Sequence, residues 1–214
     1  MKSILIIGMG KFGRHLATKF HDLGNDVLIV DSDEAIINSL ASKFTDAFCG
    51  DCTNEDVIKG LGVNNFDVCF VTIGDAFQSS LEITSLLKEH KAKYIVSKAT
   101  GDLQAKFLKQ IGANEVVYPE KDMAENLAIK FNSNNVFDYI EISQDYAIYE
   151  TPVLKQWVGK TIVEIDVRKN YNINIVVVRR DGETFPSIGA DYVFSANDHI
   201  VWLGDKKALK KLTK

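Results

Sequence analysis

The sequence predicts an α/β fold, in which a Rossmann-like doubly wound parallel sheet of strand order 3-2-1-4-5-6 precedes a second, smaller α+β domain. Strand-like and helix-like segments alternate regularly over residues 2–118. A glycine-rich turn follows the first strand-like run, and the periodicity becomes mostly strand-like after Pro119. Such alternation gives a parallel sheet with helices on both faces. The strands are almost continuously apolar, as strands covered on both faces should be.

The first domain is expected to contain six strands joined by helices. The strand-like runs are SILIIG, DVLIVD, AFCG, VCFVTIG, YIVSKA and EVVYP, and the helix-like segments are 14–23, 34–44, 54–61, 77–90 and 103–111. Apolar residues of these segments recur at helical spacing. Gly112 follows the last segment, where glycine commonly ends a helix, and Asp75 is expected to cap the helix at 77–90. Six strands in two halves predict the order 3-2-1-4-5-6.

The second half begins with one more helix and then turns to strands. We place the first domain at residues 1–135, with a crossover helix at about 121–133, and the second domain at 136–214. The later runs are FDYIEIS, AIYETPV, INIVVVRR, GETFPS and HIVWLG, and a short helix is expected at 206–212. Asp181-Gly182 predicts a tight hairpin. A domain this small is marginally stable alone, so we expect it to pack against a copy of itself.

Composition narrows the class of protein. The net charge is −4, so no basic face for nucleic acid is indicated. No apolar run approaches the length that spans a membrane, and the N-terminus lacks the features of a signal peptide. We therefore expect a cytoplasmic protein.

The stretch ILIIGMGKFGRHLA carries the clearest functional signal. Gly8, Gly10 and Gly13 form a G-x-G-x-x-G between a strand and a helix, and Asp31 ends the next strand. The first glycine permits the turn, the second lets the backbone approach a phosphate, and the third permits close helix–strand packing. Asp31 is placed to bind a ribose diol, which favours NAD or adenosine nucleotides over NADP. The alternative is a degenerate Rossmann-like unit with an empty crevice.

Further candidates follow the other strands. Asp51 and Cys52 follow the third strand near the expected adenine, Gly74 follows the fourth, and Lys98 ends the fifth, where it would reach a phosphate. The alternative for Lys98 is a solvated lysine. Cys49 and Cys52 form a C-x-x-C, but the histidines are scattered and no second ligand pair is present for zinc. We expect structural cysteines, with Cys49 at the end of a buried strand.

Catalytic groups are not evident. The second domain shows no His/Asp pair, no Tyr-x-x-x-Lys and no acid cluster, and the chain has no P-loop motif. A nucleotide site without evident chemistry indicates a sensor and not an enzyme. A small NAD-dependent oxidoreductase or epimerase is the alternative, and a nucleotide-binding oligomerisation module of another transporter is a third reading.

Four stretches carry a family resemblance. They are IIGMGKFGRHLA…HDLGNDVLIVDSDE, FCGDCTNEDVIKGLGV…FDVCFVTIGDAFQSSL, SKATGDLQAKFLKQIGANEVVYPEKDMAENLA and GKTIVEIDVRKNYNINIVVVRRDGE with the tail IVWLGDKKALKKL. Together they resemble the cytoplasmic RCK-domain (regulator of potassium conductance) subunits of bacterial Ktr/Trk potassium uptake systems, the KtrA/TrkA family. The match covers essentially the whole chain, and GANEVVYPEKDMA and IDVRKNY are its most specific pieces.

The resemblance implies a regulatory subunit and not an enzyme. Such subunits bind ATP, ADP or NAD(H) at the glycine loop, pair as homodimers and form an octameric ring under a separate integral-membrane potassium channel subunit. Phe12 matches the loop, and Glu120 matches an acid that helps hold Mg²⁺ or Na⁺ between paired ATP molecules. The family's arginine that reaches the γ-phosphate is replaced by Lys11, a point charge without the bidentate fork. Arg14 is a candidate substitute.

The resemblance also implies a second ligand. Some members bind cyclic di-AMP at the two-fold interface of the second domain. The matching residues are Ile162, Val163, Asp166, Val167, Arg168, Ile173 and Asn174. The alternative is that these apolar residues only form the core of the dimer.

Overall fold

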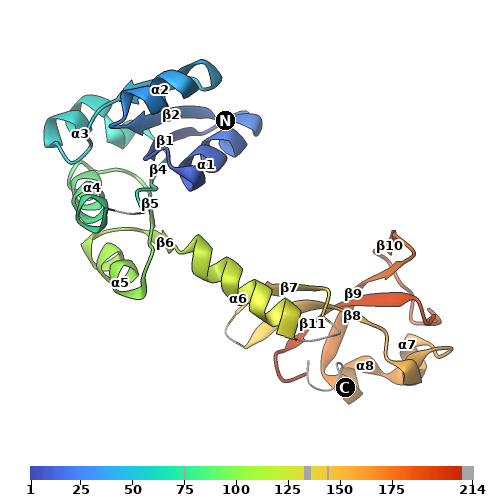
Figure 1. The fold of residues 1–214 in the computed structure, drawn as a ribbon. Coiled ribbons are helices and arrows are strands. Elements are labelled where there is room, and N and C mark those ends of the chain that lie inside the picture. Colours follow the sequence, from blue (N-terminus) through green and yellow to red (C-terminus); the bar gives the residue numbers. More distant parts are fainter. Residues whose placement is uncertain (75, 133–135, 144, 209–214) are drawn as a thin grey trace. The chain divides into compact units, whose positions relative to one another are not determined.

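The computed structural model describes residues 1–74, 76–132, 136–143 and 145–208. Internal contacts divide the chain into two units, Met1–Glu120 and Lys121–Lys214, and each is described by itself (Figure 1). The predicted capping role of Asp75 and most of the predicted helix at 206–212 lie outside the described residues. Among the described residues, no helix combines the length and apolar character needed to cross a membrane.

The first unit is a doubly wound parallel sheet in the order β3-β2-β1-β4-β5-β6, which confirms the prediction. Its strands are β1 Ser3–Ile7, β2 Asp26–Asp31, β3 Asp46–Cys49, β4 Val68–Val71, β5 Ile95–Lys98 and β6 Glu115–Val117. Its helices are α1 Lys11–Asp22, α2 Glu34–Leu40, α3 Glu55–Leu61, α4 Phe77–Glu89 and α5 Asp102–Ile111, with 3₁₀ turns η1 Ala41–Lys43 and η2 Val63–Asn65. Figure 1 shows helix following strand through this unit.

Strand β1 organises both cores of this unit. Leu5 and Ile7 pack with α3 and α4 on one face, whereas Ile4 and Ile6 pack with α1 and α2 on the other. Successive side chains of a strand point to opposite faces, so a continuous apolar run buries both. The carboxyl end of β1 is thereby held firmly at the centre of the sheet, and the glycine loop begins there.

Strand β3 corrects one expectation. It pairs only with β2, so it is an edge strand, and three of its four residues are exposed. Cys49 is therefore exposed and does not end a buried strand as predicted.

The second unit contains a long helix and an antiparallel sheet in the order β10-β9-β11-β8-β7. Its elements are α6 Pro119–Asn132, β7 Asp138–Glu141, β8 Tyr146–Pro152, η3 Lys155–Trp157, α7 Ile162–Ile165, α8 Val167–Tyr171, β9 Ile173–Arg180, β10 Glu183–Phe185 and β11 Asp198–Asp205. Asp181 and Gly182 both have positive φ between β9 and β10, as the predicted tight hairpin requires. The short helices α7 and α8 were not predicted, although Thr161 and Glu164 form a capping box.

Helix α6 joins the second unit by its packing. Sequence reasoning assigned this helix to a first domain that ends at residue 135, whereas internal contacts divide the chain after Glu120. Ile129 packs against the core of the second unit. Most of the helix is therefore grouped with the second unit, and Ile129 is a residue of it that reaches that core.

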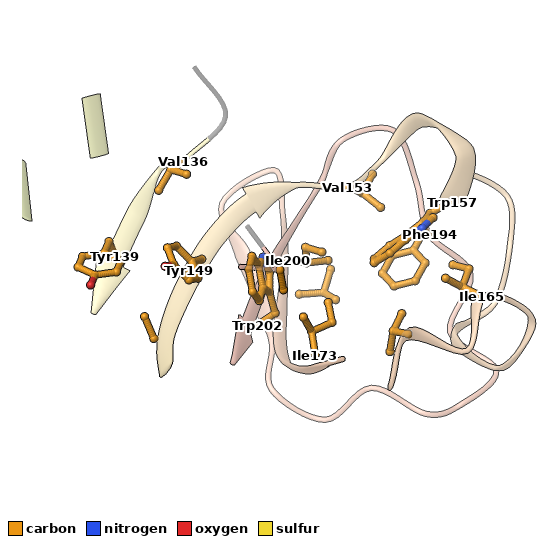
Figure 2. Close-up of a cluster of buried hydrophobic side chains, with 14 residues drawn as sticks. Val136, Tyr139, Tyr149, Val153, Trp157, Ile165, Ile173, Phe194, Ile200 and Trp202 are labelled. Carbon is orange, nitrogen blue, oxygen red and sulfur yellow. The ribbon is translucent and has the colours of Figure 1, made fainter. Parts of the chain in front are cut away.

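Aromatic side chains dominate the core of the second unit. Tyr149 stacks on Trp202 with ring centroids 4.7 Å apart, and Trp157 lies 5.6 Å from Phe194 (Figure 2). Such rings bury large apolar areas, so a small unit gains a sizeable core from few residues.

One buried carboxylate anchors the polar side of this unit. Asp198 has no exposed side-chain surface. Its oxygens accept hydrogen bonds from the Arg180 guanidinium at 2.6 Å, the Tyr192 hydroxyl at 2.9 Å and the Ser195 backbone N–H at 2.8 Å. Burial raises the pKa of Asp198, but these donors outweigh burial and hold it below its ordinary value.

Candidate nucleotide site

A cavity of about 460 Å³ lies at the carboxyl end of the parallel sheet. Strand order reverses between β1 and β4, and ligands of doubly wound sheets bind at such a point. Six predicted residues line the cavity, namely Gly8, Gly10, Asp31, Asp51, Cys52 and Gly74. Ile73, which was expected with Gly74 in the turn after the fourth strand, also lines it. The lining further includes residues that sequence reasoning missed, namely Ile7, Ser32, Ile36, Gly50, Thr53, Thr72, Ala76, Ser79 and Ile83.

Two glycines of the loop are required by close packing. Gly8 has a φ of +99°, and a Cβ there would lie 2.9 Å from Cγ1 of Ile73. A Cβ on Gly13 would lie 2.1 Å from the Gly8 carbonyl oxygen and 2.7 Å from the Thr72 hydroxyl oxygen. That hydroxyl donates to the Gly8 carbonyl at 2.5 Å. Helix α1, the loop and β4 are therefore locked together.

Gly10 differs from the other two. A Cβ on Gly10 would meet no atom within 4 Å, so the protein itself does not need a glycine here. Gly10 is also the N-cap of α1, and no side chain caps that end. The first N–H groups of a helix lack partners within the helix and suit an anion. The open surface at Gly10 therefore has the properties of a phosphate site.

Asp31 ties the loop to the end of β2. Its Oδ2 accepts a hydrogen bond from the Met9 backbone N–H at 2.6 Å, and its Oδ1 accepts one from the Asp33 N–H at 2.9 Å. The carboxylate is half-buried at the cavity wall. It is thus held beside the loop, as a ribose-binding acid must be.

The cationic residues of the loop have different surroundings. Arg14 donates from Nε to the Met9 carbonyl at 2.6 Å, so its guanidinium supports the loop. Lys11 is exposed in the first turn of α1. Neither they nor Phe12 and Gly13 line the cavity. Lys11 is therefore better placed than Arg14 to meet a ligand that extends beyond the loop.

The turn after β3 supplies the far wall. Asp51 accepts hydrogen bonds from the Thr53 backbone N–H at 2.9 Å and hydroxyl at 2.8 Å, and these lower its pKa. Cys52 is buried against the cavity, and burial raises its pKa to about 12. Both Cys49 and Cys52 are free. Cys52 is therefore a small apolar part of the wall.

Lys98 and Glu120, predicted as separate ligands, contact each other. Lys98 Nζ lies 2.6 Å from Glu120 Oε1 and 5.8 Å from the Phe12 ring centroid. The hydrogen bond from Lys98 lowers the pKa of Glu120. Lys98 does not line the cavity, but a Cβ on Gly74 would lie 3.4 Å from its Nζ. The ammonium group therefore lies directly behind the Gly74 wall.

A second cavity, of about 540 Å³, lies in the second unit. Its lining includes five predicted residues, Ile162, Val163, Asp166, Val167 and Arg168, together with Ile175, Ile188, Gly189 and Ala190. The other two predicted residues do not line it. Ile173 is buried in the core and Asn174 is exposed on the same strand.

Family models match both units. The TrkA-N domain matches residues 4–119 and the TrkA-C domain matches residues 147–214. This chain belongs to the TrkA-N/TrkA-C family. Curated relatives extend the likeness over the full length. Ktr system potassium uptake protein C of Bacillus subtilis is 36% identical over 100% of this chain and 96% of its own, and protein A of that organism is 33% identical over 98% and 95%.

Solved structures share the fold. The GsuK RCK domain aligns with a TM-score of 0.69 at 21% identity over 99% of this chain and 47% of its own. The GsuK channel bound to NAD aligns with a TM-score of 0.72 over 100% of this chain and 39% of its own. This chain thus spans under half of those chains. The AMP-bound Kef C-terminal domain of Shewanella denitrificans covers 61% of this chain and 79% of its own at 26% identity, with a TM-score of 0.53.

The lining residues that were not predicted have only weak signals in the sequence. Thr72 follows directly on β4, Ser32 on β2 and Gly50 on β3. A rule that every first residue after a parallel strand is a candidate would have found them. Ser79 and Ile83, on α4, carry no such signal, because only packing brings their helix to the cavity.

Proposed function

We propose that this protein is the cytoplasmic, nucleotide-sensing regulatory subunit of a potassium uptake system. The observation that carries the proposal is the cavity in which an uncapped helix N-terminus meets a held carboxylate, Asp31. Relatives that match the full chain are potassium uptake proteins. A nucleotide cavity in such a chain fits a sensor of energy state or redox state.

The ligand is an adenosine nucleotide, ATP or ADP, or NAD(H). A cavity of about 460 Å³ is within the usual range for small-molecule sites. Asp31 would accept hydrogen bonds from the ribose hydroxyls and would repel a 2′-phosphate. The loop at Gly10 would receive a phosphate, and Asp51 and Cys52 would flank the adenine. Structures that share the fold carry NAD, ADP and AMP.

The mechanism is binding and not catalysis. A ligand shifts an equilibrium only by its different affinity for two states. Homodimers assembled as an octameric ring would pass that shift to an integral-membrane potassium channel subunit. Lys11, in the first turn of α1, would distinguish a third phosphate, with Mg²⁺ or Na⁺ held at Glu120. The second cavity would take cyclic di-AMP, with Arg168 at a phosphate and Ile162 and Val163 against an adenine.

Calorimetry of the purified chain tests the proposal. ATP, ADP, NADH, NADPH and cyclic di-AMP are titrated separately, and light scattering gives the oligomer size. We expect binding of ATP, ADP or NADH, with NADPH weaker, and a mass of about eight chains. Asp31→Asn should weaken binding. The matched control Asp33→Asn should not, because Asp33 caps α2 and asparagine caps equally well.

Two results would contradict the proposal. Absence of binding by all the adenosine nucleotides would overturn the nucleotide site. A monomer that oxidises NADH with a small-molecule substrate would support the alternative of a small oxidoreductase.

A further inference from the structure

We propose that Lys98 is a phosphate-binding residue of the nucleotide site and that its ion pair with Glu120 competes with phosphate binding. Glu120 would thus weaken the binding of nucleotides that carry several phosphates. This inference rests on the proposed function, since it concerns the same cavity. The ion pair would thus be autoinhibitory, because the carboxylate of Glu120 competes with a bound nucleotide for the ammonium group of Lys98.

The position of Lys98 is the first argument. Its side chain is only 12% exposed, and its Nζ lies near Phe12, which belongs to the first turn of α1. Gly74 separates the ammonium group from the cavity, and Gly74 has no side chain to block the way. A lysine has four rotatable bonds along its stem, so its head can move by a few ångströms while the stem stays packed.

Charge is the second argument. Lys98 is a cation held near the uncapped N-terminus of α1, where a phosphate is expected. Its partner in the structure is Glu120, which is 61% exposed in the first turn of α6. A phosphate of a bound nucleotide would compete with this carboxylate for the same ammonium group. Each additional phosphate places more negative charge within reach of Lys98.

The proposal predicts that the loss of a site residue's charge increases nucleotide affinity. Removing the negative charge of Glu120 should strengthen nucleotide binding, because Lys98 no longer has to leave a partner. The gain should grow with the number of phosphates, from AMP to ADP to ATP. If Glu120 acted only as a cation ligand, removing its charge would give no gain in nucleotide affinity when divalent cations are absent.

Calorimetry in EDTA with Glu120→Gln tests this. We expect ATP to bind about three- to tenfold more tightly than to the wild type, which is the scale of one ordinary net hydrogen bond, as suits a pair whose carboxylate is mostly exposed. The affinity for AMP should stay within about twofold. Lys98→Met, which keeps most of the apolar stem, should weaken ATP by a similar factor. In the double variant, Glu120→Gln should bring no gain over Lys98→Met.

Controls separate this inference from the proposed function. Glu55→Gln breaks a similar pair, Glu55–Lys59 at 2.9 Å on α3, away from the cavity lining, and should leave ATP affinity unchanged. Thermal melts establish that each variant is folded. If the wild type binds no adenosine nucleotide, the proposed function fails. If the wild type binds ATP but Glu120→Gln binds it equally or more weakly in EDTA, only the restraint by Glu120 is refuted.

Discussion

Substitution of alanine for each of two loop glycines should separate folding from ligand binding. A Cβ on Gly13 would lie 2.1 Å from a backbone oxygen that is held by the Thr72 hydroxyl, so neither atom can yield easily. Overpacking of this kind costs about 1–3 kcal/mol, and the backbone contact places Gly13→Ala near 3 kcal/mol. Gly10 has no neighbour within 4 Å and an extended conformation open to alanine. Gly10→Ala should therefore cost less than about 1 kcal/mol.

Thermal melts and calorimetry give the two readouts. Gly13→Ala should lower Tm by about 6–12 °C, as expected for a chain of this size. Gly10→Ala should melt close to the wild type but bind ATP at least about tenfold more weakly, because its methyl group occupies the approach of a phosphate. Gly60→Ala is the matched control. It lies within α3 with open space around it, so alanine should be neutral or stabilising.

Either of two outcomes would refute this reasoning. Wild-type affinity of Gly10→Ala for ATP would show that no phosphate approaches the loop there. A wild-type Tm of Gly13→Ala would show that the contact between helix α1 and the loop is not tight.

Three further predictions concern other parts of the chain. Asp198→Ala should lower the stability of the second unit by about 1.5–3 kcal/mol in urea unfolding, because it removes the buried carboxylate that accepts from Arg180, Tyr192 and the Ser195 N–H. Asp198 has a lowered pKa, so its contribution is present above about pH 4 and is lost as the pH falls further; a difference between variant and wild type that is unchanged at pH 3 would contradict this. Asp31→Asn should reduce the preference for NADH over NADPH in calorimetry by about tenfold, since the charge that repels the 2′-phosphate is removed; an unchanged preference would show that other groups set it. Alkylation of the folded chain at pH 8 should modify Cys49 alone, because Cys52 and Cys69 are buried with pKa values raised to about 12, and intact mass spectrometry should show one adduct per chain and not three.

The local features of the nucleotide site could be predicted from the sequence. Gly8 and Gly13 follow from the spacing of the motif, and the structure gives each a steric reason. Their signal is strong because backbone conformation and close approach leave glycine without a substitute. Asp31 was found because it ends a recognisable strand.

The second unit shows where such reasoning stopped. Its strands were predicted from their periodicity, but α7 and α8 are four and five residues long, too short for a periodic pattern. The assignment of Ile173 to a ligand cavity illustrates the same limit. Neighbouring residues of a strand face opposite sides, and only the register of β9 against β11 decides which side is the core.

The sequence by itself determined the alternation of strands and helices, the glycine loop and the acid at the end of β2, because each depends on neighbours along the chain. The order of the strands could then be predicted, because such alternation favours one doubly wound arrangement. Only the tertiary structure decided that Lys98 and Glu120, which are separated by 22 positions, contact each other. It also decided that Cys49 is exposed while Cys52 is buried. The exposure of each cysteine depends on which strand lies at the edge of the sheet. The ion pair depends on how far the two side chains reach toward each other. Pairing and packing between distant segments set these distances, and local sequence patterns do not record them.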